Sequence, residues 1–318
     1  MGVKRRGALG VIRSVVSIPR TPSGALKMWP GSAMVESVTP YTAEGKAARL
    51  GSLLIFFSLT FVVTWATWLA AWALSRGGTS GYPPAGFGTV LFYLGVFAPG
   101  IVAVSLTSWT EGPAGVLALL SRLIQWHVGL RWYVFALAYM AAIKLTAAII
   151  HRLVTGVWPG FGSEPLALML AAIAASMLFF GQAGEELGWR GYALPRLAAR
   201  IGLGAASIVL GVVWAAWHLP LFFIPGIETT GQSFPLYALG VAALSVAISW
   251  LYANTNGSLF MTMLMHSAIN NTKDIVPTGA RPPANPFSLT ASTMGWITAG
   301  LLWICAGYFL VQMRRRAI

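Results

Sequence analysis

Long apolar runs separated by short polar segments dominate the chain after residue 48 and determine its architecture. Eight of these runs hold about 20 residues, the length at which a helix crosses ~30 Å of hydrocarbon. The runs cover residues 50–75, 87–108, 131–153, 166–190, 203–224, 234–253, 257–275 and 293–313. Because they are continuous rather than alternating in short segments, they indicate helices and not the strands of a barrel. The pattern predicts an all-α fold, a polytopic membrane helix bundle of about eight transmembrane helices.

Residues 1–48 have a different composition, since they are polar, basic and interrupted by proline, glycine and serine. A segment of this kind buries too little apolar surface to become ordered. We therefore expect a mostly disordered cytoplasmic tail at residues 1–48. Residues 49–318 then form one transmembrane domain, because no internal repeat and no change of composition divides them.

Composition and charge support a membrane protein and limit its partners. The chain is 57% hydrophobic and 9% charged, with a mean hydropathy of +0.71, whereas soluble domains carry about 25% charged residues. The net charge of +13 does not indicate nucleic-acid binding, because most basic residues lie in the tail or flank apolar runs. The expected partner is the lipid bilayer. Cys305 is the only cysteine, which excludes an internal disulfide and a cysteine-based metal site.

The basic residues also predict the orientation of the bundle. With eight spans, 16 Lys and Arg residues fall on the side of the termini and four on the opposite side. Because basic loops remain in the cytoplasm, both termini are expected there. The short loops between the predicted helices and the preference for Arg over Lys indicate a multi-pass protein of a bacterial cell membrane.

A small set of polar residues lies within the apolar runs. Ionised groups at that depth cost roughly 2.5–3.5 kcal/mol each and are usually functional. The set comprises Glu185, Glu186 and Arg190 in the fourth run, His218 in the fifth, and His266 and Asn270 in the seventh. Such residues normally face the bundle interior and contact one another. A single one of them is as well explained by hydrogen bonding between helices, but three groups together predict a functional site.

Helix geometry assigns different roles to the two adjacent carboxylates. Glu186 and Arg190 have i,i+4 spacing with the acid first, the better order for an ion pair. Glu185 is about 100° further round the helix and points elsewhere. A carboxylate without its own arginine, in a cavity of low dielectric constant, suits proton transfer.

The two histidines pose a problem of depth. On a rise of 1.5 Å per residue, His266 lies about 13 Å from the cytoplasmic end of its run. His218 lies about 22 Å deep if its helix starts at Leu203. Helix tilt, a kink at Pro220 or a later helix start must bring the two histidines together. Asn270 follows His266 by one helical turn and is expected to share its face.

These residues form three ordered motifs, Glu185-Glu186-x-x-x-Arg190, Trp214-x-x-x-His218 and His266-x-x-x-Asn270. They resemble the EExxxR, FxxxH and HxxxN/D motifs of the CPBP family of intramembrane endopeptidases. That family includes the type II CAAX prenyl proteases and the bacterial Abi bacteriocin-immunity proteins. The resemblance covers about residues 165–275. Trp214 stands where the family usually has Phe, and as a large aromatic residue it is expected to keep a role in shaping the cavity.

The resemblance implies hydrolysis of a peptide bond in a membrane-associated protein or peptide. By analogy with the family, Glu185 and His218 activate a water molecule. His266 and Asn270 stabilise the developing oxyanion, while Glu186 and its arginine orient the reactive acid. No cofactor is then required.

Zinc catalysis is the alternative within the same family. Glu185, His218 and His266 would form a three-ligand site with an open position. Nothing in the chain resembles the HExxH zinc signature, so metal-free glutamate catalysis is favoured.

Two other classes of protein fit the same polar residues. One is a non-enzymatic membrane binding or immunity protein that uses the same cavity. The other is a proton-coupled transporter, which is disfavoured because the chain has no evident inverted repeat. Lys144 lies within the third run. The simpler interpretation is that its side chain extends to the membrane interface. The alternative is that it lines a cavity.

Overall fold

A computed structural model describes residues 43–75, 86–227, 229–277 and 285–315, with side chains described from residue 51 onward. These ranges contain helices and no strand, as the sequence predicts. The α-helices are α2 (Ala43–Ser75), α3 (Phe87–Ser121), α4 (Leu130–Thr155), α5 (Leu166–Phe179), α6 (Gln182–Glu186), α7 (Leu194–Trp217), α8 (Phe234–Asn254), α9 (Leu259–Thr272) and α10 (Thr293–Arg315). A π-helix, η2 (Leu187–Ala193), joins α6 to α7, and the short 3-10 helices are η1 (Arg122–Ile124), η3 (Leu219–Phe222) and η4 (Lys273–Ile275). Most of the predicted tail, residues 1–42, lies outside the described residues.

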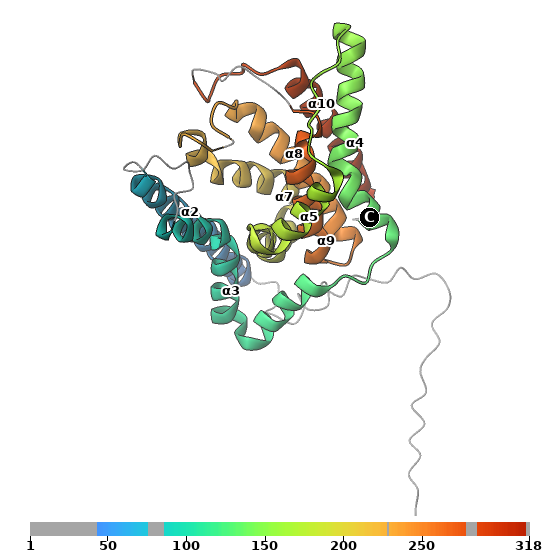
Figure 1. Cartoon of the computed structure of the whole chain (residues 1–318). Coiled ribbons are helices and arrows are strands. Elements are labelled where there is room, and N and C mark those ends of the chain that lie inside the picture. The colour runs from blue at the N-terminus through green and yellow to red at the C-terminus, as the bar shows by residue number, and fades with distance from the viewer. Residues whose placement is uncertain (1–42, 76–85, 228, 278–284, 316–318) are drawn as a thin grey trace, which may run out of the picture.

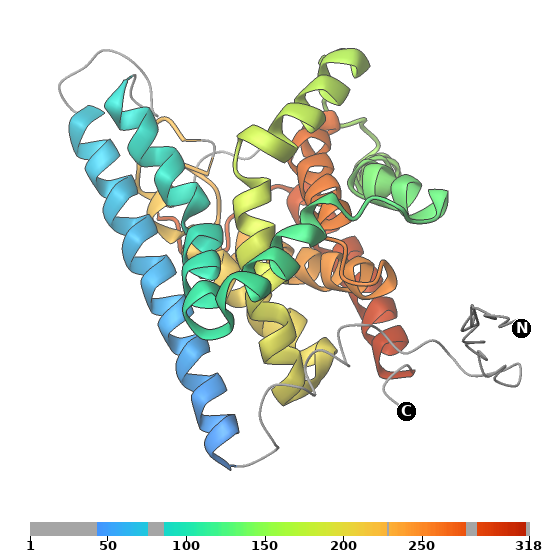
Figure 2. The same cartoon turned by 90° about the horizontal axis from the view of Figure 1, so that it is seen from below.

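The helices form a bundle with α9 at its centre. Helices α2 and α3 pack against each other as a pair on one side (Figures 1 and 2). Helix α8 packs against both α7 and α10. Helix α9 contacts α4, α5, α6 and α8, so the chain segment that carries His266 is enclosed by four others.

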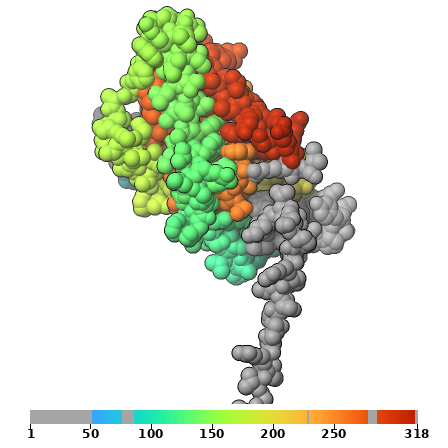
Figure 3. All heavy atoms as spheres, turned by 90° about the vertical axis from the view of Figure 1, so that its right-hand side faces the viewer, coloured from blue at the N-terminus to red at the C-terminus, as the bar shows by residue number. Residues whose placement is uncertain are grey.

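The outer surface of the bundle is apolar, which identifies a multi-pass membrane protein. Six helical segments in the described residues are long and apolar enough to cross a membrane. The fourth predicted run contributes a shorter apolar helix, α5, and the seventh forms α9; each of these helices has 14 residues. Figure 3 shows the face formed by α4 with α10 beside it. On α4 the side chains of Leu130, Val134, Ile149 and Leu153 are exposed, as expected of a surface that faces lipid.

The fourth predicted run, residues 166–190, is not one helix. Helix α5 ends at Phe179 and α6 begins at Gln182, with Gly181 between them at φ 114°. That backbone conformation strongly favours glycine, and a Cβ on Gly181 would also overlap Val96 of α3. The two carboxylates therefore sit in a separate short helix that continues through the π-helix η2 into α7.

The fifth predicted run, residues 203–224, also ends earlier than expected. Helix α7 stops at Trp217, and His218 is its C-terminal capping residue. Pro220 lies in the 3-10 helix that follows and therefore does not kink a continuing helix. Gly202, at φ 75° and ψ 157°, interrupts α7 near its start, and the bundle brings His218 to the same cavity as His266.

Close backbone contact between α3 and α6 fixes the position of the carboxylate helix. A Cβ on Gly100 would lie 2.8 Å from the carbonyl oxygen of Gly184, and a Cβ on Gly184 would lie 2.6 Å from Phe97. Small residues let membrane helices approach in this way. Because Gly184 directly precedes Glu185, the contact holds the two adjacent carboxylates against α3.

Connections between helices gather at two ends of the bundle. At one end, Arg122 donates to the hydroxyl of Tyr252 at 2.9 Å, joining the segment after α3 to the end of α8. At the other, the amide of Gly162 donates to the carbonyl of Ile275 at 3.0 Å. The amide of Phe234 donates to the carbonyl of Pro286 at 2.8 Å. Among the described residues, the connections after α3 and α8 therefore lie together, and so do those after α4, α7 and α9.

Candidate active site

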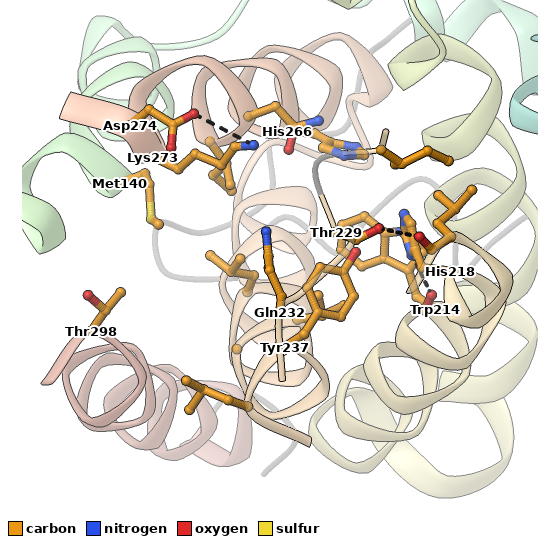
Figure 4. A pocket seen from close by; sticks show the side chains of 18 of the residues that line it. Met140, Trp214, His218, Thr229, Gln232, Tyr237, His266, Lys273, Asp274 and Thr298 are labelled. Atoms are coloured by element: carbon orange, nitrogen blue, oxygen red, sulfur yellow. Dashed lines mark hydrogen bonds and ion pairs between the residues drawn. The ribbon is translucent and has the colours of Figure 1, made fainter. Parts of the chain in front are cut away.

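The candidate site is a cavity of about 570 Å³ within the helix bundle, which falls in the usual size range for ligand sites. All four residues predicted to be catalytic line it, namely Glu185, His218, His266 and Asn270. They come from α6, the end of α7, and α9, so segments far apart in sequence converge as predicted. Figure 4 shows His218, Trp214 and His266 close to one another at one side of this space.

Glu186 and Arg190 lie behind the cavity and are fully buried. Arg190 Nη1 donates to Glu186 Oε1 at 2.8 Å, so the predicted i,i+4 pair is present. The same oxygen also accepts a hydrogen bond at 3.0 Å from Nδ1 of His266. Sequence reasoning missed this second partner. One buried carboxylate thus holds both the arginine of its own helix and the histidine of α9.

Glu185 points away from this pair, as its helical position predicts. The indole Nε1 of Trp214 donates to Glu185 Oε2 at 2.8 Å. Oε1 of Glu185 accepts no hydrogen bond from the residues that the structure describes. One carboxylate oxygen is therefore fixed by the protein, and the other remains for a ligand or water.

Trp214 has a larger role than the expected one of shaping the cavity. Its ring packs edge-on against His266, with centroids 5.0 Å apart, and lies 6.0 Å from the ring of His218. The guanidinium of Arg190 lies 4.6 Å from the centre of the same ring, a cation–π contact. A phenylalanine could keep these ring contacts but could not donate to Glu185. The indole N–H was the signal in the sequence that could have indicated the bond.

Both histidines are held through Nδ1. His218 Nδ1 lies 2.9 Å from the carbonyl oxygen of Trp214, which can only accept, so Nδ1 carries the proton. His266 Nδ1 is bonded in the same way to the Glu186 carboxylate. In the neutral ring, Nε2 of each histidine is left with a lone pair. His218 can therefore accept a hydrogen bond from water, whereas His266 can donate from Nε2 only when its ring is doubly protonated.

The two asparagines at the end of α9 differ in what they contact. Asn270 is exposed and lines the cavity, so its amide is accessible to a ligand. Asn271 donates to the hydroxyl of Ser176 at 2.9 Å and thereby ties α9 to α5. Ser176 and Ser267 are also hydrogen-bonded to each other. The motif's asparagine is thus the one that faces the cavity.

The residues considered for zinc do not form a metal-binding group. The Nδ1 contacts of His218 and His266 resemble those that orient zinc-ligating histidines. However, no three His, Cys, Asp or Glu side chains within the described residues lie close enough together to hold a metal ion. Because catalytic zinc requires three protein ligands, Glu185, His218 and His266 do not fit a zinc site in this arrangement.

Comparison with known proteins matches the region that contains these residues. A family model described as type II CAAX prenyl endopeptidase Rce1-like matches residues 165–272. The chain is also 25% identical over 232 residues to the CAAX prenyl protease 2 of Methanococcus maripaludis. That alignment covers 70% of this chain and 84% of the relative.

Both matches support the CPBP family of intramembrane endopeptidases, whose motifs the chain resembles. The protein is a peptidase of the CAAX protease type. The match at residues 165–272 spans α5 to α9, and thus every residue predicted for the site. Helices α2, α3, α4 and α10 lie outside the matched region.

Proposed function

We propose that this chain hydrolyses a peptide bond of a membrane-associated protein or peptide with Glu185 as the general base. The observation that carries the proposal is the contrast between the two adjacent carboxylates. Glu186 is bonded to Arg190 and His266, while Glu185 is held by one neutral donor and faces the cavity. A base requires access to water and a free acceptor atom, and of the two only Glu185 meets both conditions.

The proposed reaction begins with a water molecule between Glu185 and His218. Glu185 Oε1 takes the proton of the water, and His218 Nε2 accepts the hydrogen bond from its second O–H group. The oxygen attacks the peptide carbonyl carbon, and the resulting oxyanion is stabilised by the Asn270 amide and by His266 when its ring is doubly protonated. The C–N bond then breaks, and the proton held by Glu185 passes to the leaving amine. The products are a carboxylic acid and an amine.

Comparative proteomics of membranes tests this proposed function. Cells that produce the natural protein are expected to contain peptide N-termini that are missing from cells producing Glu185→Ala. Glu164→Ala is a matched control, because Glu164 is exposed on the connection before α5. The two variants must be present in the membrane at equal levels. If the sets of N-termini in natural and Glu185→Ala membranes are the same, Glu185 is not the catalytic base.

Replacement of Trp214 by Phe is expected to lower kcat about tenfold and leave KM nearly unchanged. The substitution keeps an aromatic ring beside Arg190 but removes the N–H that orients Glu185, and hydrogen bonds to charged groups contribute roughly 1.5–3 kcal/mol. Steady-state cleavage kinetics of the purified protein in detergent provide the measurement.

Trp303→Phe is the matched control for that experiment. Trp303 is half-buried and is not among the residues that line the cavity, and its N–H donates to the carbonyl oxygen of Leu239 at 3.0 Å rather than to Glu185. The control is expected to retain kcat. Equal losses in the two variants would contradict a specific positioning role for Trp214.

We also propose that both termini lie in the cytoplasm and that the protein resides in a bacterial cell membrane. The support is the distribution of Lys and Arg, with 16 on the side of the termini and four on the other. Arg122 lies in η1 and Arg196 in the first turn of α7, both assigned to that side, and both act electrostatically on Tyr252 at the end of α8. Of these basic residues, Arg76, Arg281, Arg316 and the six before residue 43 lie outside the described residues.

A further inference from the structure

Lys144 is a buried cation that the proposed reaction does not use. It lies near the middle of α4, in one of the helices long enough to cross the membrane, and only 3% of its surface is exposed. A lysine near the centre of such a helix costs roughly 2.5–3.5 kcal/mol on insertion scales and marks a functional position by default. Burial excludes the simpler expectation that the side chain snorkels to the interface.

Neighbouring groups satisfy this ammonium only in part. Its Nζ donates to the carbonyl oxygen of Val276 at 3.0 Å, whereas an ammonium has three hydrogens to donate. No carboxylate in the part of the chain that the structure describes forms an ion pair with it. The charged groups that act on it, Asp274 and Lys273, have opposite signs and are paired with each other at 3.8 Å. Lys144 therefore lies buried without an acidic side chain paired to it among the described residues.

Lys144 lines the same cavity as Glu185. Met140 precedes it by one helical turn and lines the cavity too, so this face of α4 forms one wall. Figure 4 shows Met140 across the cavity from His218, with Lys273 and Asp274 on the Met140 side. The cavity thus has the proposed catalytic groups at one side and a buried cation in a different wall.

We propose that Lys144 binds a carboxylate of the substrate peptide and so fixes which peptide bond lies beside Glu185. This inference rests on the proposed peptidase function. A carboxylate supplies the missing negative charge and accepts the remaining hydrogens of the ammonium in short, strong hydrogen bonds. Every linear peptide with a free end carries one such group at its C-terminus, and acidic side chains are the second source.

Binding of a labelled peptide separates these sources without depending on cleavage. The protein is the full chain with Glu185→Gln, which prevents turnover, in phosphatidylcholine nanodiscs. The probe is a dye-labelled, prenylated CAAX-type peptide with a free C-terminal carboxylate, compared with the same peptide amidated at its C-terminus. Fluorescence anisotropy is expected to show that the free carboxylate binds at least about tenfold more tightly.

Lys144→Gln, made in the same Glu185→Gln background, removes the charge but keeps a donor for the Val276 carbonyl. In this variant the ratio of the two affinities is expected to fall to about one, while Lys144→Arg keeps the preference. A third peptide, amidated but with a glutamate near its end, binds as tightly as the free carboxylate if the source is an acidic side chain.

Three outcomes would overturn the proposal. They are equal affinities for all three peptides, a preference that survives Lys144→Gln in protein with an unchanged elution profile, and no binding of the free-carboxylate peptide. Failure of the proposed function appears separately, as cleavage that persists in Glu185→Gln protein.

Discussion

Glu185→Gln protein is expected to lose peptide cleavage by a factor of about 10² to 10⁴ while it remains folded in the membrane. The substitution preserves the size of the side chain and an oxygen that accepts from Trp214 Nε1, which lies 2.8 Å from Glu185 Oε2 in the natural protein. It removes the atom that takes the proton from water, and general base catalysis contributes a factor of that size. The measurement is the single-turnover rate of the purified protein on a peptide found by the comparison of N-termini.

Glu164→Gln is the control, because the same chemical change is made at an exposed position outside the cavity. Its rate is expected to equal that of the natural protein. Natural cleavage rates in Glu185→Gln protein would place the base elsewhere. The alternative hypothesis, a non-enzymatic binding or immunity protein, predicts instead that the biological effect persists in this variant. Measuring that effect in cells provides an independent check.

Glu186→Gln is expected to affect stability more than any other conservative change in the site. The carboxylate is fully buried and compensates the charge of Arg190, whose Nε and Nη2 have no hydrogen-bond partner among the described residues. Removing one partner of a buried ion pair costs about 3–5 kcal/mol, because the other charge remains in a medium of low dielectric constant. Chemical unfolding of the protein in mixed micelles, followed by tryptophan fluorescence, measures the loss.

The double variant Glu186→Gln/Arg190→Gln distinguishes charge from packing. Removing the uncompensated cation is expected to restore part of the lost stability. The hydrogen bond to His266 then joins two neutral groups, so cleavage is expected to stay below the natural rate. A double variant less stable than Glu186→Gln alone would contradict an ion pair as the source of the effect.

The order of the helices and the residues that line the candidate site could be predicted from the sequence. Apolar runs of membrane length locate the helices because lipid requires each span to satisfy its own backbone. Charged and polar groups inside such runs stand out for the same reason, and this is how Glu185, His218 and His266 were found. Helical spacing then separated Glu185 from Glu186, since residues four apart share a face and adjacent residues do not.

The contacts between helices could not be predicted from the sequence in the same way. The break at Gly181 lies in an apolar run where a glycine does not by itself signal a left-handed conformation. Whether a glycine takes that conformation depends on its neighbour Val96 in α3. The bonds from Trp214 to Glu185 and from His266 to Glu186 join residues 29 and 80 positions apart. Their geometry follows from packing, which helical periodicity does not encode.

The sharing of Glu186 between Arg190 and His266 has a consequence for how the protein is made. The ion pair forms within one helical segment, so Arg190 can be neutralised as soon as that segment has been synthesised. The histidine arrives only with α9, 80 residues later. A nascent chain that ends before α9 carries both carboxylates and His218 but lacks His266 and Asn270. The proposed catalytic groups are therefore complete only after α9 has been synthesised.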